Sequence, residues 1–234
     1  MARASRRWTM FLAAAIVLIL TLYNLTDLTQ WELSDCFTWL TADSRNDVHH
    51  AIIWKDVPQR NPVVTMTSLP TGEPAAIPRI QYHFAEESSS RKAERLERLA
   101  AVKKSFVHSW KGYRRHAWLQ DEVAPISKGY KNEFGGWGAT LVDTLDTLYI
   151  MGLEKEFTVA VAALKKIDFS TTELDTVNVF ETTIRYLGGL LSAYDLSRGR
   201  HPILLEKAVQ LSDMLYAAFD TPNRMPVARW DWKK

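Results

Sequence analysis

The sequence predicts an all-α folded region from about residue 91 to residue 234. Five stretches in this region place apolar residues at helical spacing, and short connections containing Gly, Pro, Asp or Ser separate them. No alternating strand pattern of comparable length accompanies them. Because helices joined by short loops pack as antiparallel neighbours, we expect this region to consist of helical hairpins.

The amino-terminal end of the chain predicts a membrane anchor. Residues 8–25 contain no charged side chain, and as a helix they would span about 27 Å, close to the thickness of the bilayer's hydrocarbon core. Three arginines precede this run, at Arg3, Arg6 and Arg7. The positive-inside rule then makes residues 1–7 a cytosolic tail and places the rest of the chain in the lumen. A cleaved signal peptide is the alternative, although the run ends without a small-residue cleavage site. We therefore expect a single-pass type II protein that contacts the lipid bilayer through residues 8–25.

Residues 26–90 are predicted to form an irregular lumenal stem. Five prolines between Pro58 and Pro78 interrupt any long periodic pattern, and residues 86–90 are polar and low in complexity. We expect no packed core of the stem's own. The short apolar stretch Ala51–Trp54 is a part of the stem that could dock onto the later domain.

Three helices are expected after the stem. The first covers residues 91–118 and gathers apolar residues on or near one side: Leu96, Leu99, Phe106, Trp110 and Tyr113. The second begins after Gly136 and ends at Gly152, with an apolar stripe at Leu141, Leu145 and Leu148. The third covers residues 155–166 and brings together Phe157, Val161 and Leu164.

A fourth helix surrounds Glu181, and a fifth covers residues 202–219. The fourth has a stripe at i, i+4, i+7 and i+11 that predicts its buried side: Phe180, Ile184, Leu187 and Leu191. Gly188 and Gly189 each cost a helix about 1 kcal/mol relative to Ala, which indicates close backbone packing or room for a ligand. The fifth helix aligns four apolar residues, at Leu204, Ala208, Leu211 and Leu215.

Charged residues within these apolar helices are the candidates for chemistry. Glu181 and Arg185 are four apart, so their side chains can reach each other and the carboxylate need not be buried unpaired. Asp143 and Asp146 lie in the middle of an apolar helix, where a carboxylate needs hydrogen-bond donors or a wet cavity. Purely structural roles remain open: an ion pair at the edge of a core helix for the first pair, and local polar contacts for the second.

Other classes of function find little support in the sequence. The net charge of +2 is small, and the basic residues do not form a nucleic-acid-binding motif. The six histidines do not cluster, and there is no His-Glu-x-x-His motif, cysteine pair, phosphate-binding glycine loop or Gly-x-Ser-x-Gly elbow. Asp121 and Glu122 follow the first helix, where capping and loop contacts are the ordinary role. We therefore predict no metal ligands in this chain and no nucleic-acid partner.

Three stretches together closely resemble glycoside hydrolase family 47, the class I α-1,2-mannosidases. Residues 118–127 read WLQDEVAPIS, residues 134–153 read FGGWGATLVDTLDTLYIMGL, and residues 177–194 read VNVFETTIRYLGGLLSAY. The resemblance continues through residues 205–209 and 219–226, with the motifs in the order that the family has them. It covers residues 91–234, the first part of that family's longer catalytic domain.

The family resemblance implies a partial (α/α)7 barrel of helical hairpins with the sugar held inside. The implied reaction is the inverting hydrolysis of terminal α-1,2-linked mannose on high-mannose N-glycans of glycoproteins. Glu181 matches the family's proton-donating acid, Arg185 its neighbouring basic residue, and Asp143 an acidic residue at the substrate site. The resemblance also implies a Ca²⁺ cofactor, whose ligand segment matches nothing in this chain. The anchor and stem fit the family's members in the Golgi or endoplasmic reticulum membrane.

Three further expectations follow from the same residues. Residues 91–234 would form an incomplete catalytic domain that is inactive by itself, because inversion needs a second carboxylate to act as base. A different hypothesis is a mannose-glycan-binding quality-control protein without efficient hydrolysis, in which Arg185 and Asp143 remain useful without turnover. A membrane-tethered helical protein with no sugar chemistry is a third.

Overall fold

The computed structural model describes residues 52–233. The predicted cytosolic tail, the predicted anchor at residues 8–25 and the first part of the predicted stem lie outside the described residues. Within residues 52–233, no helix combines the length and the apolar character that a membrane crossing requires.

The first predicted helix is confirmed as α2, Ser89–His116. Ser88 caps its amino terminus, because the Ser88 side chain accepts a hydrogen bond from the Arg91 backbone N–H. Only the carboxyl-terminal half of α2 is packed: Trp110 and Tyr113 are buried, whereas Leu96 and Leu99 are about half exposed.

The second predicted helix is two short helices, α3 (Ala139–Asp143) and α4 (Leu145–Ile150), which meet at Thr144. The third is confirmed as α5 (Glu154–Ala163), extended by the 3-10 turn η2 (Leu164–Lys166). Gly152 adopts a φ of +64° between α4 and α5. Glycine adopts that left-handed conformation without steric cost, so it ends α4 cleanly.

The fourth predicted helix, around Glu181, is confirmed, but it is not uniform. It begins as α6 (Val179–Glu181), continues as a π-helical turn, η3 (Thr182–Leu187), and ends as α7 (Gly188–Leu196). The fifth is confirmed as α8, Pro202–Ala217, with proline at its first position.

The predicted buried stripe of the fourth helix is wrong. In the described structure Phe180 is 64% exposed, Ile184 49% and Leu191 40%. The buried side belongs to a second set at helical spacing: Val179, Thr182, Tyr186, Leu190 and Ala193. Because both sets have the helical period, the period alone does not tell which side faces the core.

Two small antiparallel ribbons were not predicted. The first pairs β1 (Glu122–Ala124) with β2 (Gly129–Lys131), and the second pairs β3 (Val177–Asn178) with β4 (Arg229–Trp230). Strands of two or three residues are too short to give an alternating pattern. The second ribbon runs directly into α6, and Asn178 caps that helix by accepting a hydrogen bond from the Glu181 backbone N–H.

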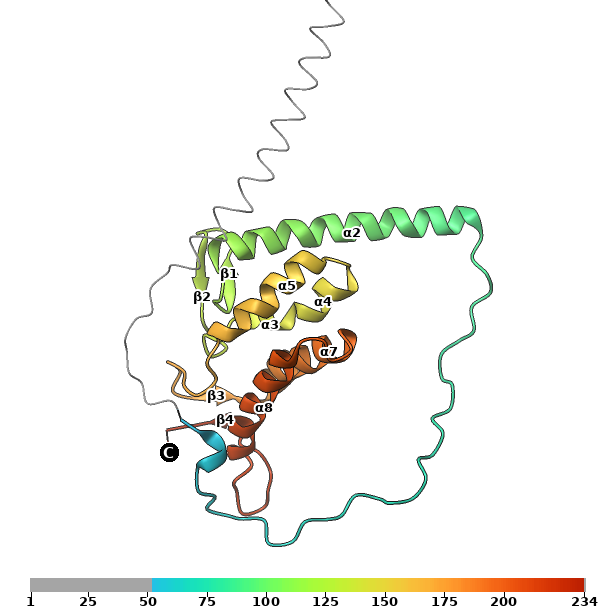
Figure 1. The fold of residues 1–234 in the computed structure, drawn as a ribbon. Helices are drawn as coiled ribbons and strands as arrows, with labels where there is room; N and C mark the ends of the chain where they lie inside the picture. Colours follow the sequence, from blue (N-terminus) through green and yellow to red (C-terminus); the bar gives the residue numbers. More distant parts are fainter. Residues whose placement is uncertain (1–51, 234) are drawn as a thin grey trace, which may run out of the picture. The chain divides into compact units, whose positions relative to one another are not determined.

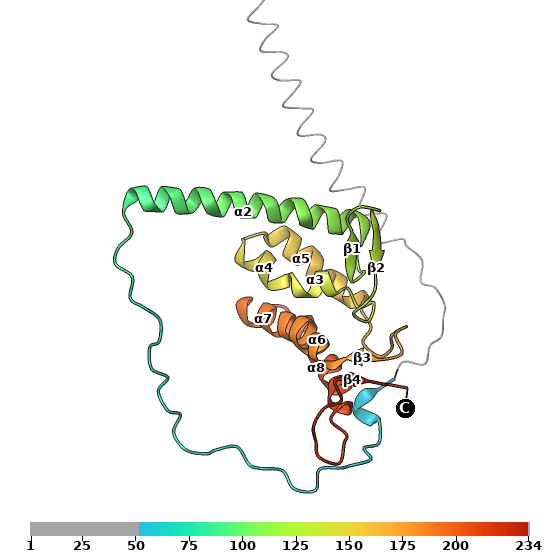
Figure 2. The same ribbon diagram turned by 180° about the vertical axis from the view of Figure 1, so that it is seen from behind.

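The helices pack in layers (Figures 1 and 2). Helix α4 lies between α5 and α7, and α7 in turn packs against α8, while α2 covers the outer side of α5. Two side chains of α2 bind Glu156 of α5: Trp110 Nε1 lies 2.6 Å from a carboxylate oxygen, and Arg114 Nη1 lies 2.9 Å from the same oxygen. The largest fully buried side chains include Tyr113, Phe169 and Tyr186.

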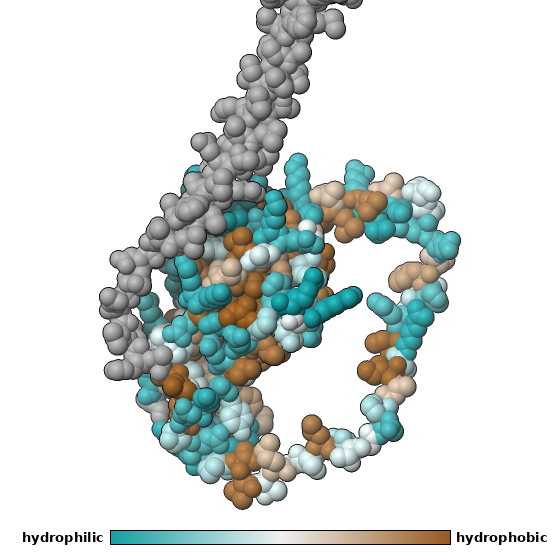
Figure 3. All heavy atoms as spheres, viewed as in Figure 1, coloured by the Kyte–Doolittle hydropathy of each residue, from teal (hydrophilic) through white to brown (hydrophobic). Residues whose placement is uncertain are grey.

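Part of the stem docks onto this domain. The 3-10 turn η1 (Trp54–Asp56) places the Trp54 ring against two tryptophans, with centroid distances of 5.3 Å to Trp230 and 6.5 Å to Trp232. Trp54 Nε1 donates to the Phe169 carbonyl at 3.2 Å. The following residues 62–88 are almost entirely exposed, and Figure 3 shows apolar residues scattered along them among polar ones. Residues 57–88 therefore contain no helix or strand, whereas residues 54–56 form the docked turn.

Candidate active site

Glu181 and Arg185 form the ion pair that their spacing predicts. Arg185 Nε donates to Glu181 Oε2 at 2.7 Å across the π-helical turn. The side chain of Glu181 is 26% exposed and that of Arg185 is 36% exposed. The carboxylate is therefore partly screened from water and held by a charged donor, while it stays open on one side.

Asp143 joins the same cluster from a different helix. It is the last residue of α3, and its Oδ2 accepts a hydrogen bond from Arg185 Nη1 at 3.1 Å. The guanidinium of Arg185 also lies over the ring of Phe134, with 4.9 Å between the guanidinium carbon and the ring centroid. The structure thus brings together all three predicted site residues around one guanidinium.

The two carboxylates of this cluster raise the pKa of Arg185 by more than burial lowers it. Burial by itself would lower the pKa of Arg185, but hydrogen bonds and charge attraction from Glu181 and Asp143 raise it above its ordinary value. Arg185 is therefore a permanent cation, and two of the five N–H donors of its planar group bind the two carboxylates.

Close backbone packing fixes the distance between the helices that carry the cluster. A Cβ atom built on Gly189 of α7 would lie 2.6 Å from the carbonyl oxygen of Val142 and 3.4 Å from the Cα of Asp143. Glycine at position 189 is therefore what lets α7 lie directly against the end of α3. This contact confirms the prediction of close backbone packing for Gly189. Gly188 has only an ordinary contact, 3.8 Å from Thr183 O.

Asp146, the second carboxylate of the apolar segment, lies outside the cluster's hydrogen bonds. Its Oδ2 accepts from the Ser192 hydroxyl at 2.9 Å, so Asp146 links α4 to α7. Asp121 and Glu122 follow α2, and Asp121 makes the capping and loop contacts expected of it, including one with the backbone N–H of Ala139 at the start of α3. Asp146 and Asp121 thus have structural partners.

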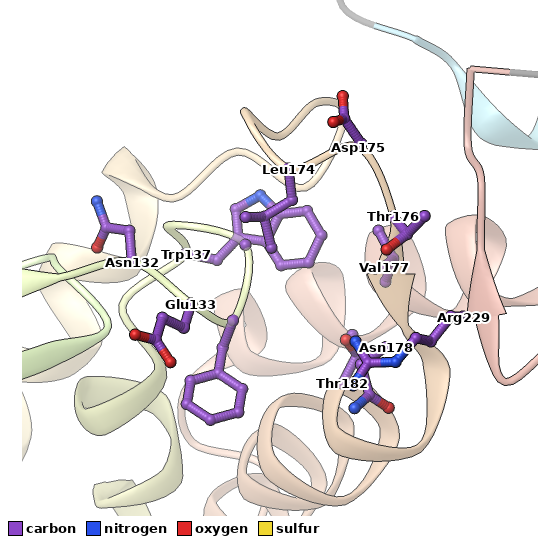
Figure 4. Close-up of a pocket in the computed structure, with 12 residues that line it drawn as sticks. Asn132, Glu133, Trp137, Leu174, Asp175, Thr176, Val177, Asn178, Thr182 and Arg229 are labelled. Atoms are coloured by element: carbon purple, nitrogen blue, oxygen red, sulfur yellow. The ribbon is translucent and has the colours of Figure 1, made fainter.

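A cavity of about 440 Å³ lies beside the cluster and shares Phe134 with it. Figure 4 shows Arg229, Asn178 and Thr182 at one side of this cavity and Asn132 and Glu133 at the other. Sequence reasoning missed these lining residues and the contact between Phe134 and Arg185. Phe134 adjoins a Gly-Gly pair, but nothing in the sequence indicates which distant side chain its ring meets.

The described residues show no carboxylate cluster of the kind that binds calcium. Across residues 52–233, no group of three or more His, Cys, Asp or Glu side chains is close enough to hold a metal ion. Calcium in proteins takes six to eight oxygen ligands, several of them carboxylates. Glu181 and Asp143 do not fit that requirement, because both are engaged by Arg185.

The model of glycosyl hydrolase family 47 matches residues 105–234, more than half of the chain. The chain belongs to this family. Glu181, Arg185 and Asp143 all lie within the matched residues, so the resemblance seen in three separate motifs is confirmed over most of the folded region.

Curated relatives carry matching names. The chain is 45% identical over 139 residues to a probable mannosyl-oligosaccharide alpha-1,2-mannosidase 1B of Aspergillus clavatus, a match that covers 55% of this chain and 27% of the relative. It is 46% identical over 131 residues to a mannosyl-oligosaccharide 1,2-alpha-mannosidase of Arabidopsis thaliana, covering 56% of this chain and 23% of the relative. The chain thus spans about a quarter of the length of these family 47 relatives.

A solved family 47 structure shares the fold of the described helices. The alpha-1,2-mannosidase from Trichoderma reesei matches with a TM-score of 0.56 and 38% identity, covering 58% of this chain and 31% of that protein. The all-α prediction is therefore confirmed at the level of a helical mannosidase fold, although it did not include the two short β-ribbons of the described structure.

Proposed function

We propose that this protein is an inverting α-1,2-mannosidase that removes terminal α-1,2-linked mannose from high-mannose N-glycans. Family membership and the names of the relatives support the reaction class. The single structural observation that carries the proposal is the bridge that Arg185 makes between Glu181 on one helix and Asp143 on another. A charged cluster that is built across two helices and left partly open to solvent suits the binding and protonation of a polar substrate.

In this proposal Glu181 is the general acid. It donates a proton to the departing glycosidic oxygen as water adds to the anomeric carbon, the old C–O bond breaks, and a base takes the proton of the water. Inverting glycosidases place the acid and the base about 6.5–9.5 Å apart to leave room for that water. Arg185 orients Glu181, and Asp143 binds sugar hydroxyls. The resemblance assigns Asp143 to the substrate rather than to the water.

Three finer features belong to the same proposal. The helical hairpins form part of an (α/α)7 barrel whose interior holds the sugar. Residues 8–25 anchor the protein in the bilayer of the Golgi or the endoplasmic reticulum, with the catalytic part in the lumen. The enzyme uses Ca²⁺ bound by residues outside the Glu181 cluster.

A mannose-glycan-binding protein without efficient hydrolysis is the second candidate. The observation that favours it is the geometry of Arg185, which holds both Glu181 and Asp143. Two carboxylates on a guanidinium offer several hydrogen-bonding groups to sugar hydroxyls, whether or not a proton is transferred.

The two candidates are separated by one experiment on the complete protein expressed from the gene, whatever its length. Release of mannose from an α-1,2-linked mannobiose and from a high-mannose glycan is followed by ¹H NMR, and binding of the same sugars is measured by calorimetry. The variants are Glu181→Gln and the control Asp146→Asn, which changes a carboxylate outside the cluster.

The mannosidase proposal predicts release that falls by about two to four orders of magnitude in Glu181→Gln, the usual scale of general acid catalysis, and that stays near wild type in Asp146→Asn. Binding without release, retained in Glu181→Gln, would favour the glycan-binding candidate instead. If the folded protein neither binds nor releases mannose, both candidates are wrong.

A further inference from the structure

Asp121 is a fully buried carboxylate, with none of its surface exposed. Its two oxygens accept four hydrogen bonds. Oδ2 accepts from the backbone N–H groups of Phe134 and Gly136, each at 2.8 Å. Oδ1 accepts from the backbone N–H of Ala139 at 3.0 Å and from the Tyr186 hydroxyl at 2.9 Å. A buried carboxylate with four donors is well compensated for the water that it has lost.

Each of these donors belongs to a segment that forms part of the Glu181 cluster. Phe134 supplies the ring beneath the Arg185 guanidinium. Ala139 is the first residue of α3, the short helix that ends in Asp143. Tyr186 directly follows Arg185 in the π-helical turn. Asp121 therefore contacts the three segments that supply Phe134, Asp143 and Arg185, while it lies inside the protein.

Tyr186 links this carboxylate to the irregular part of the helix. Its side chain is fully buried, and its single hydroxyl proton is shared between two acceptors, Asp121 Oδ1 at 2.9 Å and the Phe134 carbonyl oxygen at 2.8 Å. The ring of Tyr186 packs edge-on against Trp137 and Phe169, with centroid distances of 5.8 and 5.9 Å. Burial, and after it the charge of Asp121, raises the pKa of Tyr186, so the phenol stays protonated and remains a hydrogen-bond donor.

Tyr186 belongs to the π-helical turn. A π-helix forms hydrogen bonds between residues five apart instead of four, is rare, and is concentrated at functional sites. Here it covers Thr182–Leu187, so it separates Glu181 from α7 and contains Arg185. If the turn relaxed to regular α-helix, the residues after it would rotate relative to Glu181, and the Arg185 bridge to Asp143 would change.

We propose that Asp121 and Tyr186 are positioning residues for the Glu181 cluster: their hydrogen bond holds the π-helical turn in register, and through it the Arg185 guanidinium between Glu181 and Asp143. This inference rests on the proposed function for its effect on catalysis, but not for its effect on Arg185. Asparagine cannot replace Asp121, because it offers one acceptor oxygen in place of two and turns an amide NH₂ toward backbone donors.

The experiment uses Tyr186→Phe, which keeps the ring and removes only the hydroxyl. The matched control is Tyr113→Phe, because Tyr113 is also buried and its hydroxyl donates to the Gln120 carbonyl at 2.8 Å, not to the Asp121 carboxylate. A second test variant is Asp121→Asn. The first readout is the ¹⁵Nε–Hε NMR signal of Arg185. The full chain is labelled with ¹⁵N-arginine and kept in detergent micelles, and the signal is assigned by its absence in Arg185→Lys.

The expected result is a downfield, slowly exchanging Arg185 Nε–Hε signal in the wild type and in Tyr113→Phe, and a shifted, fast-exchanging signal in Tyr186→Phe and in any folded Asp121→Asn. In the complete protein, mannose release in Tyr186→Phe should fall about ten- to hundredfold in kcat with little change in KM, as small displacements of catalytic groups do. The control should lose stability to a similar extent without that loss of turnover.

An unchanged Arg185 signal in Tyr186→Phe would overturn the inference, whatever the activity. The inference is equally wrong if Tyr113→Phe alters the Arg185 signal as much as Tyr186→Phe does, since the effect would then be general loosening. Failure of the proposed function looks different: mannose release would be absent from the wild type or unaffected by Glu181→Gln, while the Arg185 signal would still respond to Tyr186→Phe.

Discussion

The substitution Gly189→Ala tests the close approach between α7 and the end of α3. The added methyl group would lie 2.6 Å from the Val142 carbonyl oxygen and 3.2 Å from its carbonyl carbon. Both atoms belong to the backbone, so a side-chain rotation does not relieve the overlap, and the two helices must move apart.

The size of the effect follows from two opposing terms. Overpacking a well-packed interior by a methyl group costs about 1–3 kcal/mol. Alanine is favoured over glycine within a helix by about 1 kcal/mol. Gly188→Ala gains the same helical preference but meets only an ordinary contact of 3.8 Å to Thr183 O. The helical preference therefore cancels between the two variants, and Gly189→Ala should be less stable than Gly188→Ala by about 1–3 kcal/mol.

The assay is thermal unfolding of both variants beside the wild type, followed by circular dichroism. For a domain of this size, about 1 kcal/mol shifts Tm by roughly 2–4 °C, so Gly189→Ala should unfold about 2–12 °C below Gly188→Ala. Equal melting temperatures for the two variants would refute the packing argument.

Other predictions concern the docked turn and the cluster. A hydrogen bond from the backbone N–H of Arg60 lowers the pKa of Asp220 below its ordinary value of 3.8. Burial opposes this shift in part, and a second hydrogen bond from the backbone N–H of Asn61 adds to it. Folding therefore favours the ionised Asp220 carboxylate. Its contribution to the stability of the folded state is complete above pH 3.8 and is lost as the pH falls through the lowered pKa of Asp220. Asp220→Ala should therefore release residues 54–61 from the domain at neutral pH, as acid should in the wild type. Limited proteolysis measures this, and cleavage within residues 54–61 should be faster in the variant. A cleavage rate equal to that of the wild type would contradict the prediction. Arg185→Lys should weaken mannoside binding by about tenfold, because lysine cannot bridge Glu181 and Asp143 as a planar group does. Calorimetry checks this, and unchanged affinity would mean that the bridge does not shape the site.

Local signals predicted where the helices lie in the sequence, but not how each one is built or which side is buried. The proline at position 202 marks the start of α8 and Gly152 the end of α4, whereas α2 begins two residues before the predicted start because Ser88 caps it. The break at Thr144 and the π-helical turn could not be predicted, because tertiary contacts determine them. The hydrogen bond from Tyr186 to Asp121 joins residues that are remote in sequence, and no periodic pattern reports it.

The candidate site was predictable only where its contacts join residues that are close in the sequence. The ion pair between Glu181 and Arg185 follows from helical spacing alone. Asp143 was placed at the site by the family resemblance, since its contact with Arg185 crosses from one helix to another. Phe134 was missed, because a ring beneath a guanidinium leaves no signal in its own sequence neighbourhood.

The central claim is that Glu181 protonates the oxygen that leaves mannose. It is tested most directly by following the anomeric protons of the released sugar in the complete protein, in the wild type and in Glu181→Gln. The account predicts that β-mannose appears first, as inversion of an α-linkage requires, and that its release falls by about two to four orders of magnitude in Glu181→Gln. Release of α-mannose as the first product, or a rate in Glu181→Gln equal to that of the wild type, would contradict it.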